Sequence, residues 1–556
     1  MSAKTTHEAP KQQRPAGKIA LACFLFIAFA AIPVHAQFTF WDRYDFSCDD
    51  GLGCVPWNNA QLAQGTDGNL YGTTLNGGTH AFGTIFMVTP SGSYTDLWEF
   101  DGVTGENPEG GLTLASDGNF YGVATNGGTF NCGTAFRFTP PNNLTVLHDF
   151  NCATDGWNPI APPVQGADGN LYGAAFSGNI YTITLANGTF NALPGGAPEG
   201  VYAPLYLAWN GDLYGTSSLG GDYSQGTIFR VKTPSGAVTV MFSFDGFFFG
   251  QSPDSPVVQY SDGYLYGTSF GTSTPYPGYI YKMSLSGSIF AAYQFSPLSG
   301  STNTDGANPD AGLLVASDGY LYGATSYGGA NSLGTIYQFN PKTTAFKKLY
   351  DFTASGFQLP THATNLIQHT NGSFFGVTSY LGANGNGVFY NLTKPNLLQI
   401  LKVAGPIYVL PGGPVQILGN GLTQIATLNF ANVPAVFQIV SDTQLTATVP
   451  FDAVDGVISG AYATGLPVQT VSSMRILPVI TALDPLSGPV GTQVTISGGG
   501  FTKASTVKFG GVPTTSFTVV SPSIIQATVP SGFKKGTVMV FTPNGKATST
   551  QKFTVQ

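Results

Sequence analysis

The segment Asp117-Gly-Asn-Phe-Tyr-Gly122 decides the fold, because related copies of it recur along the chain. The other six copies start at Asp67, Asp168, Asn210, Asp262, Asp318 and Asn371. A spacing of about 50 residues, with strand-forming composition, is typical of the blades of a β-propeller. The sequence therefore predicts an all-β chain with a seven-bladed β-propeller, and an eight-bladed ring is the alternative.

Each repeat divides into four short strands. An apolar segment such as Gly111-Leu-Thr-Leu-Ala115 precedes the Asp-Gly pair, whose tolerance of positive φ suits a hairpin turn. The Leu-Tyr-Gly strand and a Gly-rich loop follow. The third strand, such as Gly83-Thr-Ile-Phe-Met-Val-Thr89, is an unbroken apolar run and should be buried on both faces. The fourth strand ends in an aromatic–acidic signature such as Glu99-Phe-Asp101.

The same signature occurs before the first repeat, at Tyr44-Asp45-Phe46. This predicts that an N-terminal strand completes the last blade and closes the ring, which removes the exposed edges of an open sheet. Residues 397–403 are the competing candidate for the last outer strand.

Composition and charge narrow the class of partner. The chain is 42% hydrophobic and 13% aromatic, which argues against disorder, and its 73 glycines and 37 prolines suit many tight turns. The formal net charge is −8 and only 9% of residues are charged. With no Lys/Arg-rich face, nucleic acid and anionic membranes are poor candidates as partners.

Residues 1–36 have the pattern of a signal peptide. A basic start is followed by an apolar run over 19–32 and by the small-x-small site Val34-His35-Ala36. The run is shorter than the ~20 residues that a spanning helix needs, and no other stretch is apolar enough. We expect a secreted or cell-surface protein that is not inserted in a membrane after cleavage.

Four cysteines remain after cleavage, namely Cys48, Cys54, Cys132 and Cys152. An even number in an exported chain favours disulfides, and four cysteines allow three pairings. In a hairpin paired symmetrically about Asn142, Cys132 and Cys152 face each other within disulfide range. This predicts a Cys132–Cys152 bridge and leaves Cys48 to pair with Cys54.

The Asp-Gly-Asn-Leu-Tyr-Gly phrase, with Gly226-Thr-Ile-Phe229 and its equivalents, resembles the Gloeobacter/Verrucomicrobia tandem repeat of exported bacterial proteins. The resemblance covers roughly residues 60–395 and implies an architecture but no activity. The propeller is therefore assigned to residues 37–403.

The tail has a different pattern. The segment Asp484-Pro-Leu-Ser-Gly-Pro-Val-Gly491 and its continuation through Ala527-Thr-Val-Pro530 resemble an IPT/TIG domain, assigned to 477–556. Residues 404–476 are a weaker copy, with Ala447-Thr-Val-Pro450 in the matching place. The resemblance implies two immunoglobulin-like (Ig-like) sandwiches, and we expect the tail from residue 404 to fold alone.

Few residues suggest a metal site. The spacing of His362 and His369 matches no familiar zinc motif. One loop concentrates oxygen ligands and supplies the calcium candidates, which are Asn303, Asp305, Asn308 and Asp310. An Asx-rich turn before a strand explains the same residues and is the preferred interpretation, so we expect no cofactor.

No catalytic motif stands out either. The aspartates that recur once per blade belong to turns, since turn geometry requires them at every repeat. The propeller's few glutamates include Glu109, which shares a loop with Asp101, but nothing singles the two out as an acid and a nucleophile.

Ligand binding is the remaining class of function. In a propeller, the loops from strand two to strand three and from blade to blade gather on one face. Several aromatic residues fall in these segments, namely Trp157, Phe247, Phe248, Phe249, Tyr276 and Tyr279. Exposed aromatics beside Asn and Asp suit sugar stacking or a protein hot spot, and packing between blades is the alternative.

These patterns predict an exported, non-enzymatic binding, scaffold or adhesion-type protein. Its partner would be a polysaccharide or another exported protein. The alternative is a polysaccharide-active hydrolase or lyase whose carboxylates the sequence does not reveal.

Overall fold

The structure is a computed structural model that describes residues 38–48, 51–57, 60–271, 277–353, 361–395 and 398–556. The predicted signal peptide and Tyr276 lie outside the described residues. The described part is almost entirely β-structure, with one short 3₁₀ helix, η1 (Leu422–Gln424).

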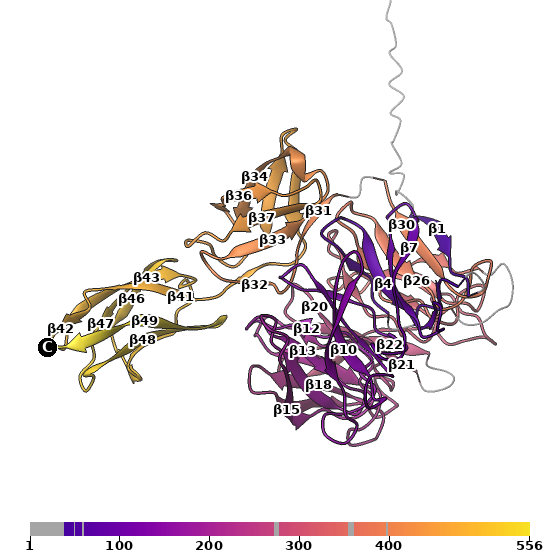
Figure 1. Cartoon of the computed structure of the whole chain (residues 1–556), viewed down its shortest axis with the longest axis horizontal. Coiled ribbons are helices and arrows are strands. Elements are labelled where there is room, and N and C mark those ends of the chain that lie inside the picture. Colours follow the sequence, from indigo (N-terminus) through magenta and orange to yellow (C-terminus); the bar gives the residue numbers. More distant parts are fainter. Residues whose placement is uncertain (1–37, 49–50, 58–59, 272–276, 354–360, 396–397) are drawn as a thin grey trace, which may run out of the picture. The chain divides into compact units, whose positions relative to one another are not determined.

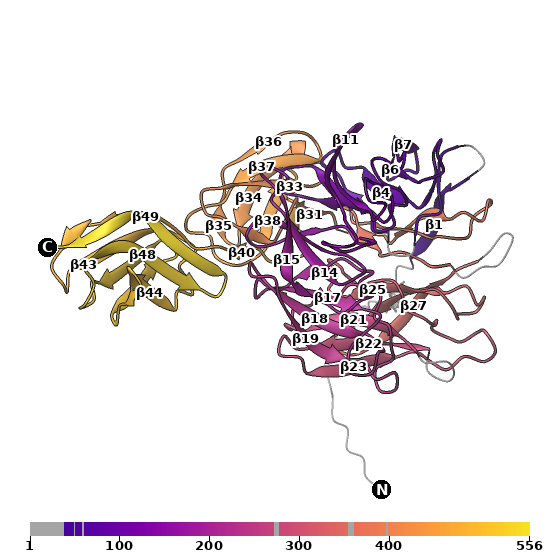
Figure 2. The ribbon, with the colours of Figure 1, turned by 60° about the horizontal axis from the view of Figure 1, so that its bottom comes forward.

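Seven four-stranded antiparallel sheets follow one another along the chain up to residue 393 (Figure 1; Figure 2). Blade 1 contains β3 (Ala63–Gln64), β4 (Leu70–Thr74), β6 (Thr84–Val88) and β7 (Tyr94–Glu99). Blade 2 contains β8 (Thr113–Leu114), β9 (Phe120–Ala124), β10 (Thr134–Thr139) and β11 (Asn143–Asp149). Blade 3 contains β12 (Val164–Gln165), β13 (Leu171–Ala174), β14 (Asn179–Ile183) and β15 (Phe190–Gly196).

The later blades repeat this order. Blade 4 contains β16 (Tyr206–Leu207), β17 (Leu213–Ser217), β18 (Thr227–Lys232) and β19 (Ala237–Ser243). Blade 5 contains β20 (Val258–Gln259), β21 (Leu265–Phe270), β22 (Gly278–Met283) and β23 (Ile289–Gln294). Blade 6 contains β24 (Leu314–Val315), β25 (Leu321–Thr325), β26 (Thr335–Phe339) and β27 (Phe346–Asp351). A separate short pair, β2 (Gly53–Cys54) with β5 (Asn76–Gly77), borders blade 1.

Blade 7 joins the two ends of the ring. Its strands β28 (Ile367–Gln368), β29 (Phe374–Val377) and β30 (Val388–Thr393) are completed by the N-terminal strand β1 (Thr39–Asp45), which pairs antiparallel with β30. The competing candidate for this outer strand was wrong. Strand β31 (Ile400–Val403), which the sequence assigned to the propeller, pairs instead with two strands of the following domain.

The repeated phrase is explained by local contacts. In blade 2 the Asp117 carboxylate accepts hydrogen bonds from the Asn119 backbone N–H (3.1 Å) and from the Tyr121 hydroxyl (2.9 Å), so one acid holds both the turn and the next strand. Gly122 is required because a Cβ there would lie 2.6 Å from the ring of Phe136. The apolar residues of strand three are buried between blades, as their unbroken run predicted, and the strand-two tyrosines are buried as well.

Both predicted disulfides are present, with Cα–Cα distances of 5.7 Å for Cys132–Cys152 and 5.2 Å for Cys48–Cys54. The symmetric register used to predict the first was wrong. Thr139 pairs with Asn143, and a bulge at Ala135/Phe136 then shifts the register so that Thr134 pairs with Asp149. The hairpin is therefore not centred on Asn142. The extra residue of the bulge in β11 then brings Cys132 and Cys152, which lie beyond the paired segment, back toward facing positions.

Two Ig-like domains follow, each built from two sheets. In the first, a sheet with the order β35-β34-β38-β39-β31-β33-β37-β36 is accompanied by the β32–β40 pair. Its strands are β31, β32 (Tyr408–Val409), β33 (Pro414–Leu418), β34 (Ile425–Phe430), β35 (Val433–Pro434), β36 (Phe437–Ile439), β37 (Gln444–Thr448), β38 (Ile458–Tyr462), β39 (Pro467–Thr470) and β40 (Arg475–Ile476).

The second domain has sheets with the orders β41-β43-β47-β46 and β42-β49-β48-β44-β45. Its strands are β41 (Val479–Asp484), β42 (Ser487–Gly488), β43 (Gln493–Gly499), β44 (Thr506–Phe509), β45 (Val512–Pro513), β46 (Phe517–Ser521), β47 (Ile524–Thr528), β48 (Lys535–Thr542) and β49 (Gly545–Val555). Strands β33-β37-β36 of the first domain correspond in order to β43-β47-β46 of the second. Each domain has its own hydrophobic core.

Candidate functional site

The loops after strand two and the connections between blades lie side by side. Isolated bridges link them, including Glu106 with Asn126 and Ala307 with Tyr327. We call this side of the propeller the loop face. Because each blade contributes one loop and one connection, the face combines residues that are far apart in the sequence.

One backbone feature recurs in every connection on this face. A residue with positive φ occurs there in all seven blades: Val55, Asn107, Asn158, Gly200, Ser252, Asn308 and His362. In blade 2 the carbonyl of this residue, Asn107, accepts a hydrogen bond from the Thr125 N–H at 3.1 Å. The left-handed conformation is therefore part of the repeat, and it favours Gly and Asn.

The three consecutive phenylalanines separate into two exposed rings and one anchor. Phe247 and Phe248 are 78% and 75% exposed, whereas Phe249 packs against Phe242 with ring centroids 5.7 Å apart. The backbone N–H groups of Phe247 and Phe248 both donate to Asp245 Oδ1, at 2.9 and 3.0 Å. The loop is thus held by its own turn while it presents two apolar rings.

The equivalent loop of blade 1 shows that this turn does not need phenylalanine. There, the N–H groups of Val103 and Thr104 donate to Asp101 Oδ1 at 3.1 and 2.8 Å. In blade 1 the Thr104 hydroxyl also donates to Asp101 Oδ1, at 2.8 Å, so the two loops share the backbone turn but differ in the side chains at its tip.

The other predicted aromatics have different environments. Trp157 is 37% exposed and lies against Phe176, which in turn contacts Tyr202, with ring centroids 5.2 and 5.1 Å apart. Tyr279 is buried in β22, and its hydroxyl accepts a hydrogen bond from Gln294. The expectation that Tyr279 is a loop aromatic was wrong, because strand β22 extends back to Gly278.

The loop face also holds three carboxylates at one equivalent position, and the sequence motifs discussed above did not relate them to one another. Glu109, Asp254 and Asp310 each follow a proline that comes after a positive-φ residue, so they occupy one equivalent position in three blades. Burial raises the pKa of Glu109 to about 7. Burial, and secondarily the charge of Asp310, raise the pKa of Asp254 to about 8. The shared Asn/Ser-Pro-acid pattern was the signal that could have identified them.

Tyr202 lies close to two of these acids. Burial raises the pKa of its hydroxyl, and the charges of Asp254 and Glu109 add to that effect. Glu109 of blade 2 and Asp254 of blade 5 therefore both raise the pKa of Tyr202, which lies between blades 3 and 4. Acids with strongly shifted pKa values are a common mark of functional sites.

Two of the calcium candidates, Asn303 and Asp305, already accept hydrogen bonds, whereas Asp310 Oδ1 is buried and has no hydrogen-bond partner among the described residues. Asn303 Oδ1 accepts hydrogen bonds from the N–H groups of Gly306 and Gly329, at 2.9 and 2.8 Å. Asp305 accepts one from the Tyr293 hydroxyl at 2.7 Å and others from Ser296. Within the described ranges, no group of three or more His, Cys, Asp or Glu residues could hold a metal ion. A calcium ion in this loop would have to displace existing hydrogen bonds.

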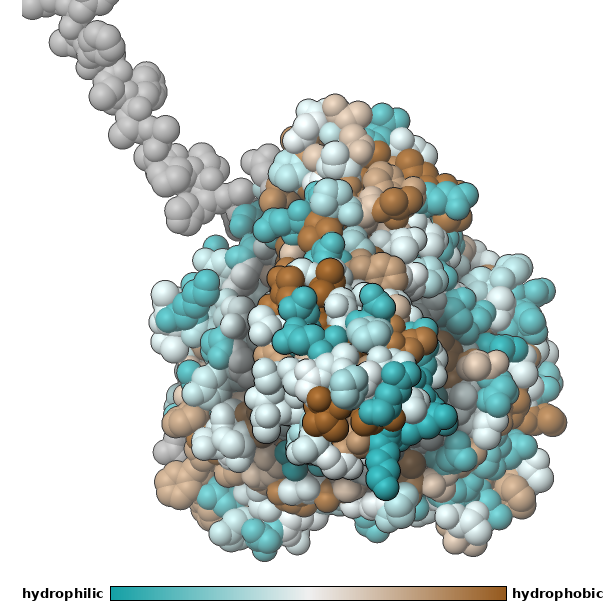
Figure 3. All heavy atoms as spheres, turned by 90° about the vertical axis from the view of Figure 1, so that its left-hand side faces the viewer, coloured by the Kyte–Doolittle hydropathy of each residue, from teal (hydrophilic) through white to brown (hydrophobic). Residues whose placement is uncertain are grey.

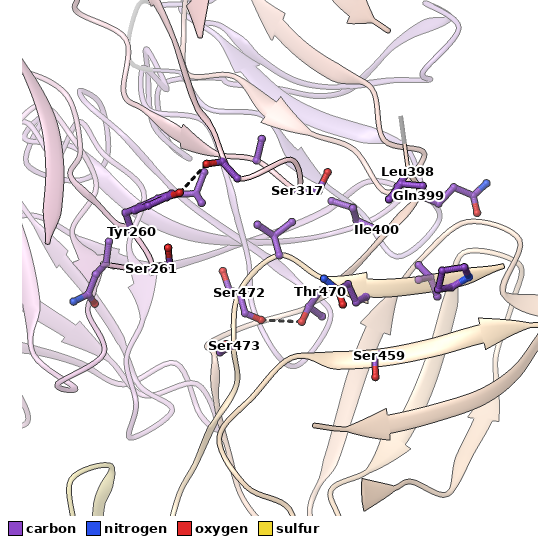
Figure 4. A pocket seen from close by; sticks show the side chains of 18 of the residues that line it. Tyr260, Ser261, Ser317, Leu398, Gln399, Ile400, Ser459, Thr470, Ser472 and Ser473 are labelled. Atoms are coloured by element: carbon purple, nitrogen blue, oxygen red, sulfur yellow. Dashed lines mark hydrogen bonds between the residues drawn. The ribbon is translucent and has the colours of Figure 1, made fainter. Parts of the chain in front are cut away.

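The opposite side of the propeller, with the Asp-Gly turns, contacts the first Ig-like domain. The Thr443 hydroxyl donates to the Thr66 carbonyl at 2.7 Å, and the Tyr408 hydroxyl donates to the Ala208 carbonyl at 3.1 Å. A pocket of about 500 Å³ lies at this junction (Figure 4). Neutral side chains such as Ser261, Ser317 and Ser473 line much of it, Lys342 also lines it, and none of the described residues in its lining is an acid.

One face of the molecule can be followed in a space-filling view coloured by hydropathy. Figure 3 shows pale residues of intermediate hydropathy over much of one side of the molecule, with hydrophobic residues in small groups between them. This agrees with a chain in which only 9% of residues are charged.

Comparison with protein families now adds to the geometry. The model of the Gloeobacter/Verrucomicrobia repeat matches residues 30–190 and 200–405, which is more than half of the chain. The chain belongs to the Gloeobacter/Verrucomicrobia repeat family. The IPT/TIG domain model matches residues 478–555 of this family member. A comparison with curated proteins finds no match.

Several solved structures are similar to this Gloeobacter/Verrucomicrobia repeat protein. A catalytically inactive virginiamycin B lyase from Staphylococcus aureus with quinupristin is 14% identical, with a TM-score of 0.43, over 64% of this chain and 99% of that chain. A fungal alcohol oxidase of the AA5 family with copper is 14% identical, with a TM-score of 0.45, over 79% and 99%. An oligogalacturonate lyase from Vibrio parahaemolyticus is 13% identical, with a TM-score of 0.41, over 65% and 97%. Likeness at this level does not extend to activity.

Two observations bear on the compartment of this repeat-family member. The two disulfides are consistent with an extracellular protein. Over the part of the chain that the structure describes, no helix has the length and hydropathy needed to cross a membrane.

Proposed function

We propose that this chain is an exported, non-enzymatic binding protein. The loop face of the propeller binds a polysaccharide or another exported protein, and the two Ig-like domains serve as a stalk or docking module. The observation that carries the proposal is the exposure of Phe247 and Phe248, at 78% and 75%, on a loop held by its own hydrogen bonds.

Two adjacent exposed phenylalanines are costly unless a partner covers them. Apolar surface in water favours association, and anchored aromatic rings are frequent centres of binding energy. The turn does not require them, since Val103 and Thr104 occupy the same positions in the loop of blade 1. Their side chains therefore serve something other than blade geometry.

The test is a binding screen of the mature protein against polysaccharides and exported proteins, with the double variant Phe247→Ser/Phe248→Ser. We expect about tenfold or greater loss of affinity for a ligand found in the screen, with little change in melting temperature. The matched control is Val103→Ser/Thr104→Ser, which alters the same turn in blade 1 and should leave binding intact. Unchanged binding by the phenylalanine variant, or a fall in melting temperature of many degrees, would contradict the proposal.

A second candidate function is that of a polysaccharide-active enzyme. The observation in its favour is the pair of acids with pKa values raised to about 7 and about 8, Glu109 and Asp254, because a protonated carboxyl at neutral pH is what general acid catalysis requires. Cleavage of any glycan by the purified protein, abolished in Glu109→Gln or Asp254→Asn, would favour this candidate over the first.

A further inference from the structure

His362 departs from its repeat. Its position has positive φ in every blade and is filled by asparagine at Asn107, Asn158 and Asn308. At 107, the asparagine Nδ2 donates to the Leu75 carbonyl of the preceding blade at 3.0 Å. Blade 7 thus has the larger, aromatic and titratable side chain of His362 at a backbone position that asparagine occupies in three other blades.

Blades 6 and 7 each place a tyrosine near His362, at a position that varies among the blades. Tyr327 and Tyr380 occupy the position after strand two, which Asn76 and Asn126 fill in the first two blades. Both rings lie near His362, with centroids 6.3 Å and 6.0 Å from the imidazole. Aromatic residues from two different blades thus meet around one imidazole.

The imidazole is oriented by a buried acid of the preceding blade. His362 Nδ1 lies 3.0 Å from Asp310 Oδ2, which also accepts a hydrogen bond from the Ser326 hydroxyl. The His362 backbone is held as well, since its carbonyl accepts from the Ser379 N–H at 3.2 Å. With Nδ1 engaged by a carboxylate, the ring orientation is set and Nε2 is left as the group that can bond to a ligand.

The accessible surface of this cluster has no exposed carboxylate. Side-chain exposure is 30% for His362 but only 3% for Asp310, and Tyr327 is 39% exposed. A ligand would meet phenol rings and one imidazole nitrogen, while the carboxylate stays behind the imidazole. Flat apolar faces next to a few fixed polar groups suit the C–H face and hydroxyl rim of a sugar better than they suit a cation, which needs an accessible negative charge.

We infer that Tyr327, His362 and Tyr380 form a binding site for a neutral sugar unit of a polysaccharide, with Asp310 as the positioning residue. The site is separate from the Phe247 loop, because it lies between blades 6 and 7 whereas that loop connects blades 4 and 5. It goes beyond the proposed function by assigning a second site on the loop face and by choosing a neutral sugar, rather than a protein, as the ligand of that site.

A purely structural role for His362 makes a different prediction. If the imidazole only joins blade 7 to blade 6, as Asn107 joins blade 2 to blade 1, then its replacement affects stability and the two tyrosines are irrelevant to binding. Asparagine variants separate these possibilities, because asparagine fills the equivalent positions in other blades. These variants are His362→Asn, Tyr327→Asn and Tyr380→Asn.

The experiment follows the imidazole carbon-bound protons by NMR in the full mature chain with labelled histidine. The signal of His362 is assigned by its loss in His362→Asn. Neutral oligosaccharides of glucose, xylose and mannose are titrated one at a time, with choline as a cationic probe. We expect at least one oligosaccharide to shift the His362 signal saturably, and Tyr327→Asn and Tyr380→Asn each to weaken that binding about tenfold.

The controls keep this proposal distinct from the first. The Phe247→Ser/Phe248→Ser protein should bind the same oligosaccharide as the wild type does, so failure of the loop proposal would leave this one standing. The inference is overturned if no oligosaccharide shifts the His362 signal, if choline shifts it in their place, or if both tyrosine variants keep wild-type affinity. It is also overturned if His362→Asn lowers the melting temperature by many degrees and oligosaccharide binding is nowhere observed.

Discussion

Starting the C-terminal fragment at residue 404 instead of residue 398 should unfold the first Ig-like domain. The difference is strand β31, which connects the two halves of the main sheet of that domain. Ile400 and Leu401 pair with β39, whereas Lys402 and Val403 pair with β33. Leu401 is 1% exposed and belongs to the core of this domain.

The cost can be worked from these contacts. Full burial of one leucine side chain contributes about 2 kcal/mol. Loss of a central strand also removes several backbone hydrogen bonds, at about 1 kcal/mol each. The total of about 5 kcal/mol is comparable with the whole stability of a small domain, which is about 5 kcal/mol at the low end.

The assay is thermal unfolding of three fragments, 398–556, 404–556 and 478–556, by calorimetry and circular dichroism. We expect 398–556 to unfold cooperatively in both domains. We expect 404–556 to show only the transition of 478–556, whose core is separate. If 404–556 retains a transition for the first domain at the temperature seen in 398–556, then β31 does not hold that sheet together and the reasoning is refuted.

Two further predictions concern the propeller. Replacing Cys132 and Cys152 by serine should lower the free energy of unfolding by about 3 kcal/mol, and replacing Cys48 and Cys54 should lower it by about 2 kcal/mol. The first bridge stabilises more because it closes the longer loop, with a separation of 20 residues against 6. Equal losses of free energy in urea titrations would contradict this. The raised pKa of Asp254, about 8, means that its protonated form is favoured by folding, so its stabilising contribution is full below about pH 4 and is lost as the pH rises through 8. Asp254→Asn should therefore raise the melting temperature more at pH 8 than at pH 5, and an equal effect at both would show that the carboxyl has an ordinary pKa.

The repeat architecture could be predicted because its causes are local. An Asp-Gly or Asn-Gly turn and a glycine that admits a neighbouring aromatic ring recur in each unit, and in five of the seven units a tyrosine donates to the aspartate of the turn, as in Asp117–Gly122. Turn chemistry and an apolar strand are legible in any one copy, and the regular spacing shows how copies assemble. The two disulfides also followed, although through a register that the β-bulge in blade 2 shifts.

The assignment of ambiguous strands could not be made in this way. Residues 400–403 form an apolar segment that suits either the last blade or the first Ig-like sheet. The competition was decided by β1, which occupies the edge of β30 over its whole length and leaves β31 to the next domain. Pairing partners are a property of the closed ring, so no local pattern could choose between them.

By itself, then, the sequence determined that this chain builds repeated four-stranded units followed by Ig-like modules, because turns and strand periodicity act over a few residues. Only the tertiary structure decided which residues share a surface. Asp310 and His362 are 52 positions apart, yet they are hydrogen-bonded because successive blades bring equivalent connections together on one face. The candidate sites consist of residues that differ between blades, and these residues lie next to one another only in the folded propeller.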